Sequence, residues 1–438
     1  MMKCTRIFNN VRQKLQDNIS TLGIFMIVFI RFFLILKVSK KTKKTAGVII
    51  KIKMKKKKVC ILAISLDTGG AERVISLLTK FLIKDYEVTL ILLSNNIEYQ
   101  VPNNIDIICL GERNSLSNKS LFSILKSIAK FIRQYRTLAK QKKFDVIMSF
   151  LALPNIINTM VSSRLKHQPK IIISERCYPS KMYENNGFAM KIAKTFYPMY
   201  YNKADVLFSN SIHINLDLKE NFGIKIPMEV IYNPIDVNEN KRINLRDLVF
   251  NKSLNIINSG TVYNTKNQTL ILKAMALSSP GEFKLTILGD GELMEDLRLK
   301  SKKLNIEGFL ILEGKVRDVK SHLLRNDCFV LSSNTEGFPN ALLEALSVGL
   351  PSISTNCMSG PLEMLNDNEH ISIGAGDFFK AKYGILINVN DKVALHKALI
   401  YLKRNPDERK RYSNLAFERA KYYSMSKIYG QVKNLINN

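Results

Sequence analysis

The chain has 438 residues, of which 46% are hydrophobic and 24% are charged, a composition typical of a globular protein with more than one domain. Its formal net charge is +29, so a negatively charged partner is expected. The sequence has no zinc-finger spacing, RNA-binding signature or basic zipper, so nucleic acid is not expected to be that partner. The six cysteines are scattered without a Cys-x-x-Cys pair, which argues against a disulfide framework or a zinc site and indicates a reducing, cytosolic compartment.

The N-terminal extension, residues 1–53, differs from the rest of the chain. The first 58 residues contain 13 Lys, 3 Arg and 1 Asp, a net charge of +15, whereas the other 380 residues have +14. An apolar stretch from Ile19 to Leu36 is just long enough to cross a thinned bilayer, although Arg31 within it would cost about 2.5–3.5 kcal/mol. Three interpretations stay open: a membrane anchor, an interfacial or unstructured tail, and an incorrectly assigned start before Met54.

Between residues 54 and 235, short apolar segments alternate with amphipathic ones. The segments at 71–83 and 121–140 repeat apolar side chains every three or four residues and are predicted to be helices. Alternation of this kind indicates a parallel sheet that is covered by helices on both faces. Strands are expected at residues 59–64, 88–93, 105–110, 144–150, 171–174 and 206–209.

A polar segment, residues 236–253, then interrupts the pattern and is predicted to be a linker. The alternation resumes in a second domain, residues 254–438, which ends in helices. The predicted fold is therefore α/β, with two doubly wound Rossmann-like domains that face one another across a ligand-binding cleft. The strands of the second domain are expected at residues 254–259, 284–288, 309–312, 328–332 and 352–355.

The most informative local pattern follows the predicted strand at 328–332. Glu336 begins a loop that leads into a helix, and Glu344 lies a little more than one turn into that helix. Pro339 suits the first helical turn and Gly349 the C-terminal cap, so the backbone amides of residues 337–341 are donors without intrahelical partners. Such amides can bind an anion or a hydroxyl group. The alternative is a capped amphipathic helix with two solvated carboxylates.

This pattern resembles the Glu-x7-Glu motif of retaining glycosyltransferases of family 4, which have the GT-B fold. In that family the first Glu contacts hydroxyls of the donor sugar and the second binds the ribose, so the resemblance implies these roles for Glu336 and Glu344. The resemblance covers about residues 54–438 and is strongest from Ser259 to Leu365. It implies a donor-binding loop made of Gly337, Phe338, Pro339, Asn340 and Ala341.

Other loops fit the same resemblance, although each glycine taken alone is equally typical of a tight turn. Glycines at a helix start let the backbone approach a diphosphate closely. The family usually has Arg at the position of Thr261, which leaves Lys266 to neutralise phosphate with help from Arg73 or Arg176. The resemblance implies an acceptor and diphosphate loop with Gly69, Gly70, Glu175 and Arg176, and further donor-site residues Gly260, Thr261, Lys266 and Gly291.

The resemblance implies a retaining transferase in which Glu336 and Lys266 are the catalytic residues. It would move a hexose or N-acetylhexosamine from a nucleotide-diphosphate sugar, UDP-linked, to a lipid-linked or polysaccharide precursor glycan. The basic chain suggests work at an anionic membrane surface, the inner face of the cytoplasmic membrane. No Asp-x-Asp motif occurs, so neither a metal nor another cofactor is expected. The rival interpretations are a sugar-nucleotide epimerase, a glycan phosphorylase and a degraded homologue that only binds sugar nucleotides or scaffolds a membrane complex. Thr261 would favour the degraded homologue.

Overall fold

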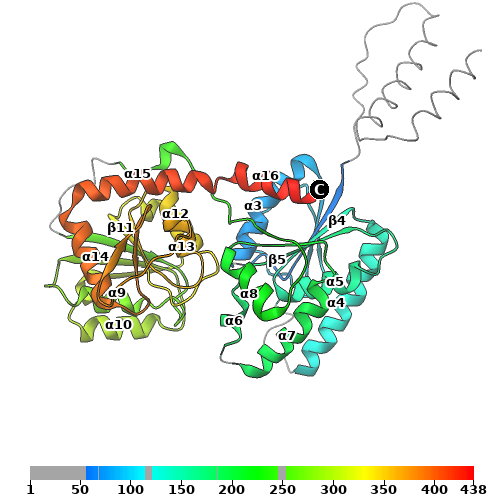
Figure 1. The fold of residues 1–438 in the computed structure, drawn as a ribbon, viewed down its shortest axis with the longest axis horizontal. Helices are drawn as coiled ribbons and strands as arrows, with labels where there is room; N and C mark the ends of the chain where they lie inside the picture. The colour runs from blue at the N-terminus through cyan, green and yellow to red at the C-terminus, as the bar shows by residue number, and fades with distance from the viewer. Residues whose placement is uncertain (1–55, 68, 114–120, 185, 245–252) are drawn as a thin grey trace, which may run out of the picture. The chain divides into compact units, whose positions relative to one another are not determined.

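The computed structural model describes residues 56–438 except for 68, 114–120, 185 and 245–252. The N-terminal extension, with its predicted anchor or tail, lies outside the described residues. The described chain contains two seven-stranded sheets with helices packed on them (Figure 1). Within that part of the chain, no helix is both long enough and apolar enough to cross a membrane.

The first sheet has the strand order β3-β2-β1-β4-β5-β6-β7 and is parallel throughout. The direction in which strands are added reverses between β1 and β4, and ligands bind α/β sheets outside the carboxyl ends of the strands at this switch point. The strands are β1 (Lys58–Ala63), β2 (Glu87–Leu92), β3 (Asp106–Cys109), β4 (Val146–Phe150), β5 (Lys170–Glu175), β6 (Val206–Ser209) and β7 (Met228–Val230).

The second sheet repeats this plan in the order β10-β9-β8-β11-β12-β14-β13. Its switch point lies between β8 and β11, and its last strand pairs antiparallel. The two sheets confirm the predicted fold class. The strands are β8 (Leu254–Ser259), β9 (Phe283–Leu288), β10 (Leu310–Gly314), β11 (Cys328–Leu331), β12 (Ser352–Thr355), β13 (Phe378–Lys380) and β14 (Ile385–Ile387).

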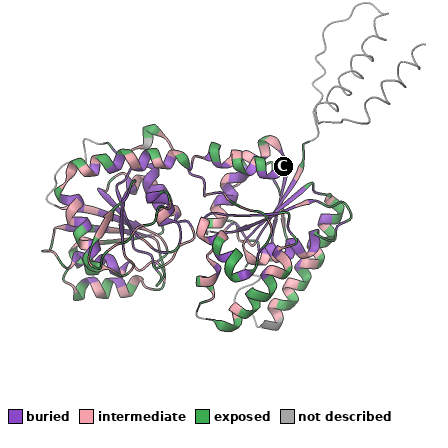
Figure 2. Cartoon of the chain, viewed as in Figure 1, coloured by how far each residue is buried: buried purple, intermediate pink, exposed green. Residues whose placement is uncertain are grey.

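Helices cover both faces of the first sheet (Figures 1 and 2). On one face, α3 (Gly70–Asp85) packs its buried side on β1, β2 and β4. The opposite face is covered by a layer that we call the outer helix layer: α4 (Leu121–Lys142), α5 (Ala152–Ser162), α7 (Gly187–Tyr201) and α8 (Ile212–Phe222). The short α6 (Pro179–Met182) joins β5 to this layer.

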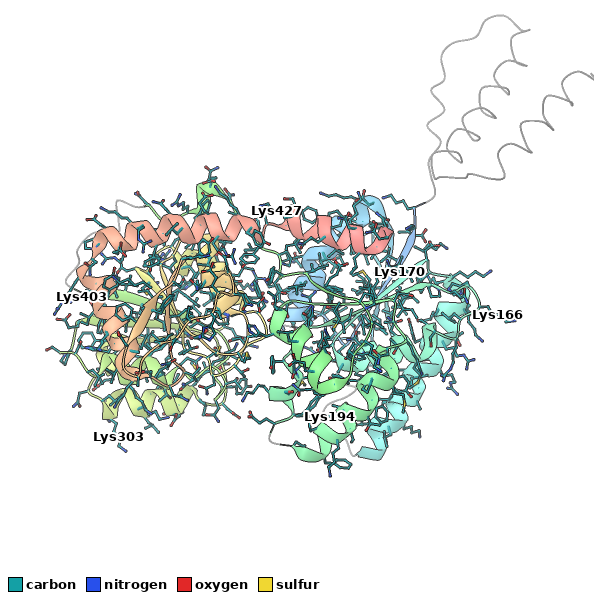
Figure 3. The ribbon with its side chains drawn as sticks, viewed as in Figure 1. Lys166, Lys170, Lys194, Lys303, Lys403 and Lys427 are labelled. Atoms are coloured by element: carbon teal, nitrogen blue, oxygen red, sulfur yellow. The ribbon has the colours of Figure 1, made fainter. Side chains whose placement is uncertain are left out.

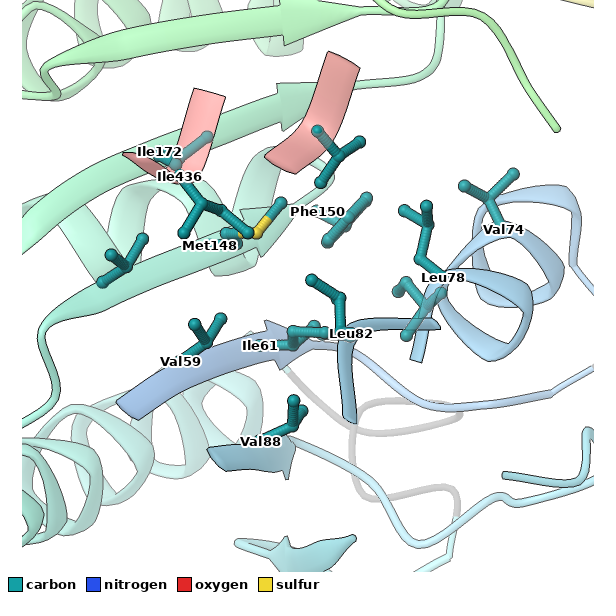
Figure 4. Packing of buried hydrophobic residues seen from close by; sticks show 14 of the residues in the cluster. Val59, Ile61, Val74, Leu78, Leu82, Val88, Met148, Phe150, Ile172 and Ile436 are labelled. Carbon is teal, nitrogen blue, oxygen red and sulfur yellow. The ribbon is translucent and has the colours of Figure 1, made fainter. Parts of the chain in front are cut away.

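The final helix, α16 (Met425–Asn437), packs on the first sheet although it follows the second in sequence. Its Ile428, Val432 and Ile436 are buried together with strand residues of β1, β4 and β5, and Figure 4 shows Ile436 beside Ile172 and Met148. The predicted domain 254–438 therefore has its last helix on the other sheet. Alternation of strands and helices gives no signal for this exchange, because an amphipathic helix does not specify which sheet covers its apolar side.

The remaining helices accompany the second sheet. They are α9 (Thr269–Met275), α10 (Met294–Lys303), α11 (Val319–Leu323), α12 (Asn340–Ser347), α13 (Pro361–Asn366), α14 (Lys392–Arg404) and α15 (Pro406–Tyr422). Three strands that the sequence analysis did not predict, β7, β13 and β14, have three residues each and lie at or next to sheet edges. Segments this short do not show a period of two residues clearly enough to be recognised.

Candidate active site

A cavity of about 550 Å³ lies where residues from the carboxyl ends of both sheets converge. Its walls are the loops after β1, β4, β5, β8 and β11 together with the start of α12. All but two of the sequence-predicted site residues line it: Gly69, Gly70, Arg176, Gly260, Thr261, Lys266, Glu336, Gly337, Phe338, Pro339, Asn340, Ala341 and Glu344. Glu175 and Gly291 are absent from this lining.

Glu336 and Lys266 form an ion pair on the second-sheet wall. The Lys266 Nζ donates to Glu336 Oε1 at 2.6 Å, and Ser333 Oγ donates to the same oxygen at 2.6 Å. The Glu336 side chain is only 9% exposed, so its carboxylate is held in one orientation while part of it faces the cavity. A carboxylate fixed in this way can accept hydrogen bonds from sugar hydroxyls, and the adjacent ammonium can neutralise a phosphate.

The start of α12 presents unpaired backbone donors to the cavity. Pro339 is its N-cap residue and forms no side-chain cap, and among the described residues the amides of Gly337, Phe338, Asn340 and Ala341 donate no hydrogen bond. The other end of the helix is closed by Gly349 (φ 70°), with Gly349 N–H donating to Leu346 and Leu350 N–H to Ala345. The C-terminal cap is satisfied within the protein, whereas the N-terminal amides remain available for an anion.

Glu344 is tied to the opposite wall. Arg73, on α3, forms a salt bridge with the Glu344 carboxylate, and the Glu344 side chain is 8% exposed. Arg73 was predicted only as an auxiliary cation, although it lies three residues after Gly70 of the predicted diphosphate loop. A buried carboxylate needs such a counter-charge, since ionisation away from water is costly. The pair places a cation beside the position that the resemblance assigns to the nucleotide.

Glycines allow the second-sheet loops to come together. An added Cβ at Gly289 would lie 1.9 Å from the carbonyl oxygen of Gly260, and one at Gly291 would lie 2.4 Å from that of Val262. Gly260 itself has a φ of 155° and donates its N–H to Leu288 at 2.9 Å. Gly291, which was predicted to bind the donor, packs against Val262 in the loop that carries Thr261, where the lack of a side chain permits close packing.

Arg176 lies in the first-sheet wall between two aromatic rings. Its guanidinium carbon is 4.9 Å from the ring centroid of Phe208 and 5.4 Å from that of Phe150, and its Nη1 donates to Asn233 Oδ1 at 3.0 Å. Its Nε has no partner among the described residues. Burial lowers the pKa of Arg176 to about 9, while the neighbouring Glu175 raises it.

The Glu175 carboxylate points away from the cavity. It accepts hydrogen bonds from the Tyr201 hydroxyl at 2.8 Å and from the backbone N–H of Arg176 at 3.1 Å, and it is 2% exposed. Burial raises its pKa to about 7, although these hydrogen bonds and Arg176 lower it. The prediction that Glu175 belongs to the acceptor and diphosphate loop is therefore corrected: its side chain packs on the face covered by α7, whereas Arg176 lines the cavity. Successive side chains at the end of a strand point to opposite faces of the sheet.

Two side chains join the two halves of the site. Asn233 Nδ2 donates to Asn340 Oδ1 at 2.7 Å, which links the end of the first half to the start of α12. Glu363, on α13, accepts from the N–H of Ile212 at 3.1 Å and from the Ser211 hydroxyl at the start of α8. Neither Asn233 nor Glu363 was predicted as a site residue from the sequence. The cavity residues Tyr99 and Asn210 had no signal in the sequence at all.

The chain also matches known families along most of its length. Residues 68–239 match the family described as Glycosyltransferase Family 4, and residues 240–419 match Glycosyl transferases group 1. A Campylobacter jejuni protein named N-acetylgalactosamine-N,N'-diacetylbacillosaminyl-diphospho-undecaprenol 4-alpha-N-acetylgalactosaminyltransferase is 30% identical over 85% of this chain and 97% of its own. The chain belongs to glycosyltransferase family 4.

A further relative and two solved structures are also similar to this chain. A second Campylobacter jejuni transferase, an alpha-1,4-N-acetyl-D-galactosaminyltransferase named for a diNAcBac-PP-undecaprenol substrate, is 25% identical over 86% of this chain and 99% of its own. Anabaena HepE, crystallised with UDP and glucose, superposes with a TM-score of 0.67 at 15% identity, covering 87% of this chain and all of that one. The lipopolysaccharide galactosyltransferase WaaB has a TM-score of 0.65 at 19% identity, over 86% and 99%. These structures show the same GT-B fold.

In the described part of this glycosyltransferase, no three His, Cys, Asp or Glu side chains gather in a way that could hold a metal ion. Thr261 does line the cavity where the family usually has Arg. The cations around it are Lys266, Arg73 and Arg176, so positive charge reaches the site from both walls.

Proposed function

We propose that this glycosyltransferase transfers a hexose or N-acetylhexosamine from a UDP-linked donor to an acceptor attached to a lipid diphosphate, with retention of configuration. The observation that carries the proposal is the convergence of Glu336, Lys266 and Glu344 with the free amides of α12 at one cavity. The relatives named for undecaprenol-diphosphate substrates support the class of acceptor. A polysaccharide precursor is the other acceptor that the family resemblance implies.

In the proposed donor complex, both glutamates accept hydrogen bonds from the donor, and only Glu336 gives up a protein partner. Glu336, now paired with Lys266, would accept from hydroxyls of the donor sugar, and Lys266 would turn to the diphosphate. Glu344 would accept from the ribose while Arg73 keeps its negative charge neutralised. Because the other charged side chains are already in position, donor binding requires little reorganisation of the site beyond the turn of Lys266.

The chemical step needs charge stabilisation more than proton transfer by the protein. As the bond between sugar and diphosphate breaks, negative charge grows on the leaving phosphate, and Lys266 and the α12 amides are positioned to stabilise it. The acceptor hydroxyl would attack from the face that the diphosphate leaves, and its proton would pass to the departing phosphate. The protein then acts mainly by orienting the two substrates, which accounts for the fixed position of Glu336.

Metal independence and location are parts of the same proposal. The sequence has no Asp-x-Asp motif, and positive charge for the diphosphate comes from side chains and helix amides. A lipid-linked acceptor requires work at a membrane, and the basic chain suits the anionic inner face of the cytoplasmic membrane.

The test is transfer from a panel of UDP-sugars to an undecaprenyl-diphosphate-linked oligosaccharide, followed by mass spectrometry and NMR of the product. We expect one added sugar whose anomeric configuration matches that of the donor, with activity unchanged by EDTA. An inverted linkage would contradict the mechanism, and loss of activity with EDTA would contradict metal independence. Absence of transfer would favour the degraded homologue, as a sugar-nucleotide binder if UDP still binds and as a scaffold if it does not.

A further inference from the structure

Helix α7 has an exposed apolar side in addition to its buried one. Phe188, Ile192, Phe196 and Met199 are 76%, 44%, 40% and 50% exposed. Their spacing of four, four and three residues places them in one stripe along the helix. Ala193, Tyr197 and Tyr201 are buried against the sheet and already supply the packing that holds the helix in place. The stripe therefore has no role in the fold that would explain it.

Apolar side chains also protrude from the neighbours of α7. Met182 on α6 is 62% exposed, Leu125 on α4 is 57% exposed and Leu216 on α8 is 45% exposed. Helices α4, α5, α7 and α8 lie next to one another on the same face of the first sheet (Figure 1). The outer helix layer thus presents several apolar side chains to its surroundings, and Figure 2 shows many exposed positions along it.

The same layer carries half of the basic excess of the folded chain. Helices α4, α5, α7 and α8 contain 9 Lys and Arg and 2 Asp and Glu, a net charge of +7, whereas all of residues 59–438 have +14. Neither α4 nor α7 contains an acidic residue. Of the two acids of the layer, both on α8, Asp217 is buried. The exposed basic residues of the two helices are Lys126, Lys130, Arg133, Arg136, Lys140, Lys191 and Lys194, of which Lys194 is labelled in Figure 3.

We propose that the outer helix layer docks on an anionic lipid bilayer, with the α7 stripe entering the interface. Lysine and arginine side chains attract anionic headgroups, and exposed Phe, Ile and Met side chains insert at the boundary between headgroups and acyl chains. Nucleic acid would use the positive charge but would leave the aliphatic part of the stripe in water. The combination of both kinds of side chain on one layer is what selects the bilayer.

The position of the stripe relative to the cavity fits an acceptor with a lipid tail. Cys177 lines the cavity, α6 begins two residues later at Pro179, and Met182 at the end of α6 is the first exposed apolar side chain. A diphosphate head near Arg176 could therefore enter the cavity while its tail stays in the bilayer. This connection rests on the proposed function, whereas the docking itself does not.

The test is co-sedimentation of the full chain with vesicles of phosphatidylcholine alone or with about 30% phosphatidylglycerol. We expect binding to the anionic vesicles, and at least about a tenfold loss of it in the triple variant Phe188→Ser, Ile192→Ser, Phe196→Ser. A matched triple variant on the second half, Leu299→Ser, Ile311→Ser, Val393→Ser, changes exposed apolar residues too and should bind as the wild type does. Both variants should keep the unfolding temperature, because the substituted side chains are exposed.

Several outcomes would overturn the proposal. Equal binding of the α7 variant and the wild type would place the membrane contact elsewhere, for example in the basic first 58 residues, which all variants retain. Equal binding to both kinds of vesicle would remove the role of the positive charge. If the wild type forms a dimer that the α7 variant does not form, and neither binds vesicles, the α7 stripe contacts a second copy of the chain and not a bilayer. Thermal stabilisation by UDP, measured in parallel, depends on the cavity alone. It therefore distinguishes a failure of the membrane-docking proposal from a failure of the proposed function.

Discussion

The two walls of the cavity differ in how their functional groups are built. On the second-sheet wall, Glu336, Lys266 and Glu344 come from loops and a helix that directly follow β8 and β11, within short motifs. On the first-sheet wall, Arg176 depends on Phe150, Phe208 and Asn233, which are distant in sequence. A wall made of local motifs can be recognised in a sequence, whereas a wall made of tertiary contacts needs the structure.

The largest effect that would sharpen this comparison is expected for Glu336→Gln. The change keeps the shape but removes the charge that pairs with Lys266 and orients the sugar, so turnover should fall by about 10²–10³-fold. UDP affinity should change much less, since the carboxylate is assigned to the sugar. Glu313→Gln, an exposed carboxylate on β10, is the control and should keep full activity. Normal transfer by Glu336→Gln would remove Glu336 from its proposed role.

A second expected effect concerns the pH dependence of stability through Glu175. Burial raises its pKa in the folded state to about 7, above the ordinary value of 4.5, so the folded state binds the proton more tightly. The contribution of the protonated Glu175 to the free energy of unfolding is then fully present below about pH 4.5 and is lost as the pH rises towards 7. Glu175→Gln lacks this loss, and its stability relative to wild type should rise by on the order of 3 kcal/mol over that range.

Urea denaturation at several pH values measures this difference. Glu220→Gln, on the exposed side of α8, is the control and should have the same pH dependence as the wild type. Parallel curves for Glu175→Gln and wild type would mean that the carboxylate is solvated in solution, and the buried support of Arg176 would have to be abandoned.

The contact between the walls can be tested with Gly337→Ala. An added Cβ would lie 2.5 Å from the carbonyl oxygen of Arg176, so the two walls must separate or shift, at a cost of about 1–3 kcal/mol. Gly308→Ala is the matched control, because nothing lies within 4 Å of its added Cβ. Thermal unfolding should show a clear loss for the first variant only. Identical curves for both would mean that the walls do not meet at Gly337.

The smallest effect is expected for Arg73→Ala. Without this guanidinium, the buried carboxylate of Glu344 lacks its counter-charge and repels a nucleotide diphosphate, so UDP affinity should fall by about five- to tenfold. Uridine, which has no phosphate, should be affected less. Lys80→Ala removes an exposed cation from the same helix and serves as the control. Unchanged or tighter UDP binding by Arg73→Ala would show that the pair does not serve the diphosphate.

The sequence predicted the two α/β domains and most of the cavity lining because both follow local rules. Strand–helix alternation specifies doubly wound sheets, and loops after parallel strands meet at one edge, so Gly69, Gly260 and Glu336 converge. The placement of α16 on the first sheet and the inward turn of Glu175 could not be predicted. Each depends on which of two surfaces a segment covers, and sequence periodicity does not distinguish them.

The central claim, a nucleotide-diphosphate donor at the paired glutamates, is tested most directly by thermal unfolding of the full chain with UDP, GDP, ADP and CDP. A nucleotide at about 100 times its dissociation constant should stabilise the fold by roughly 2.7 kcal/mol. We predict this shift with UDP, its loss in Glu344→Ala and Lys266→Ala, and its retention in the control Lys273→Ala, an exposed lysine on α9. No shift with any of the four nucleotides, or an equal shift in the glutamate variant, would contradict the account.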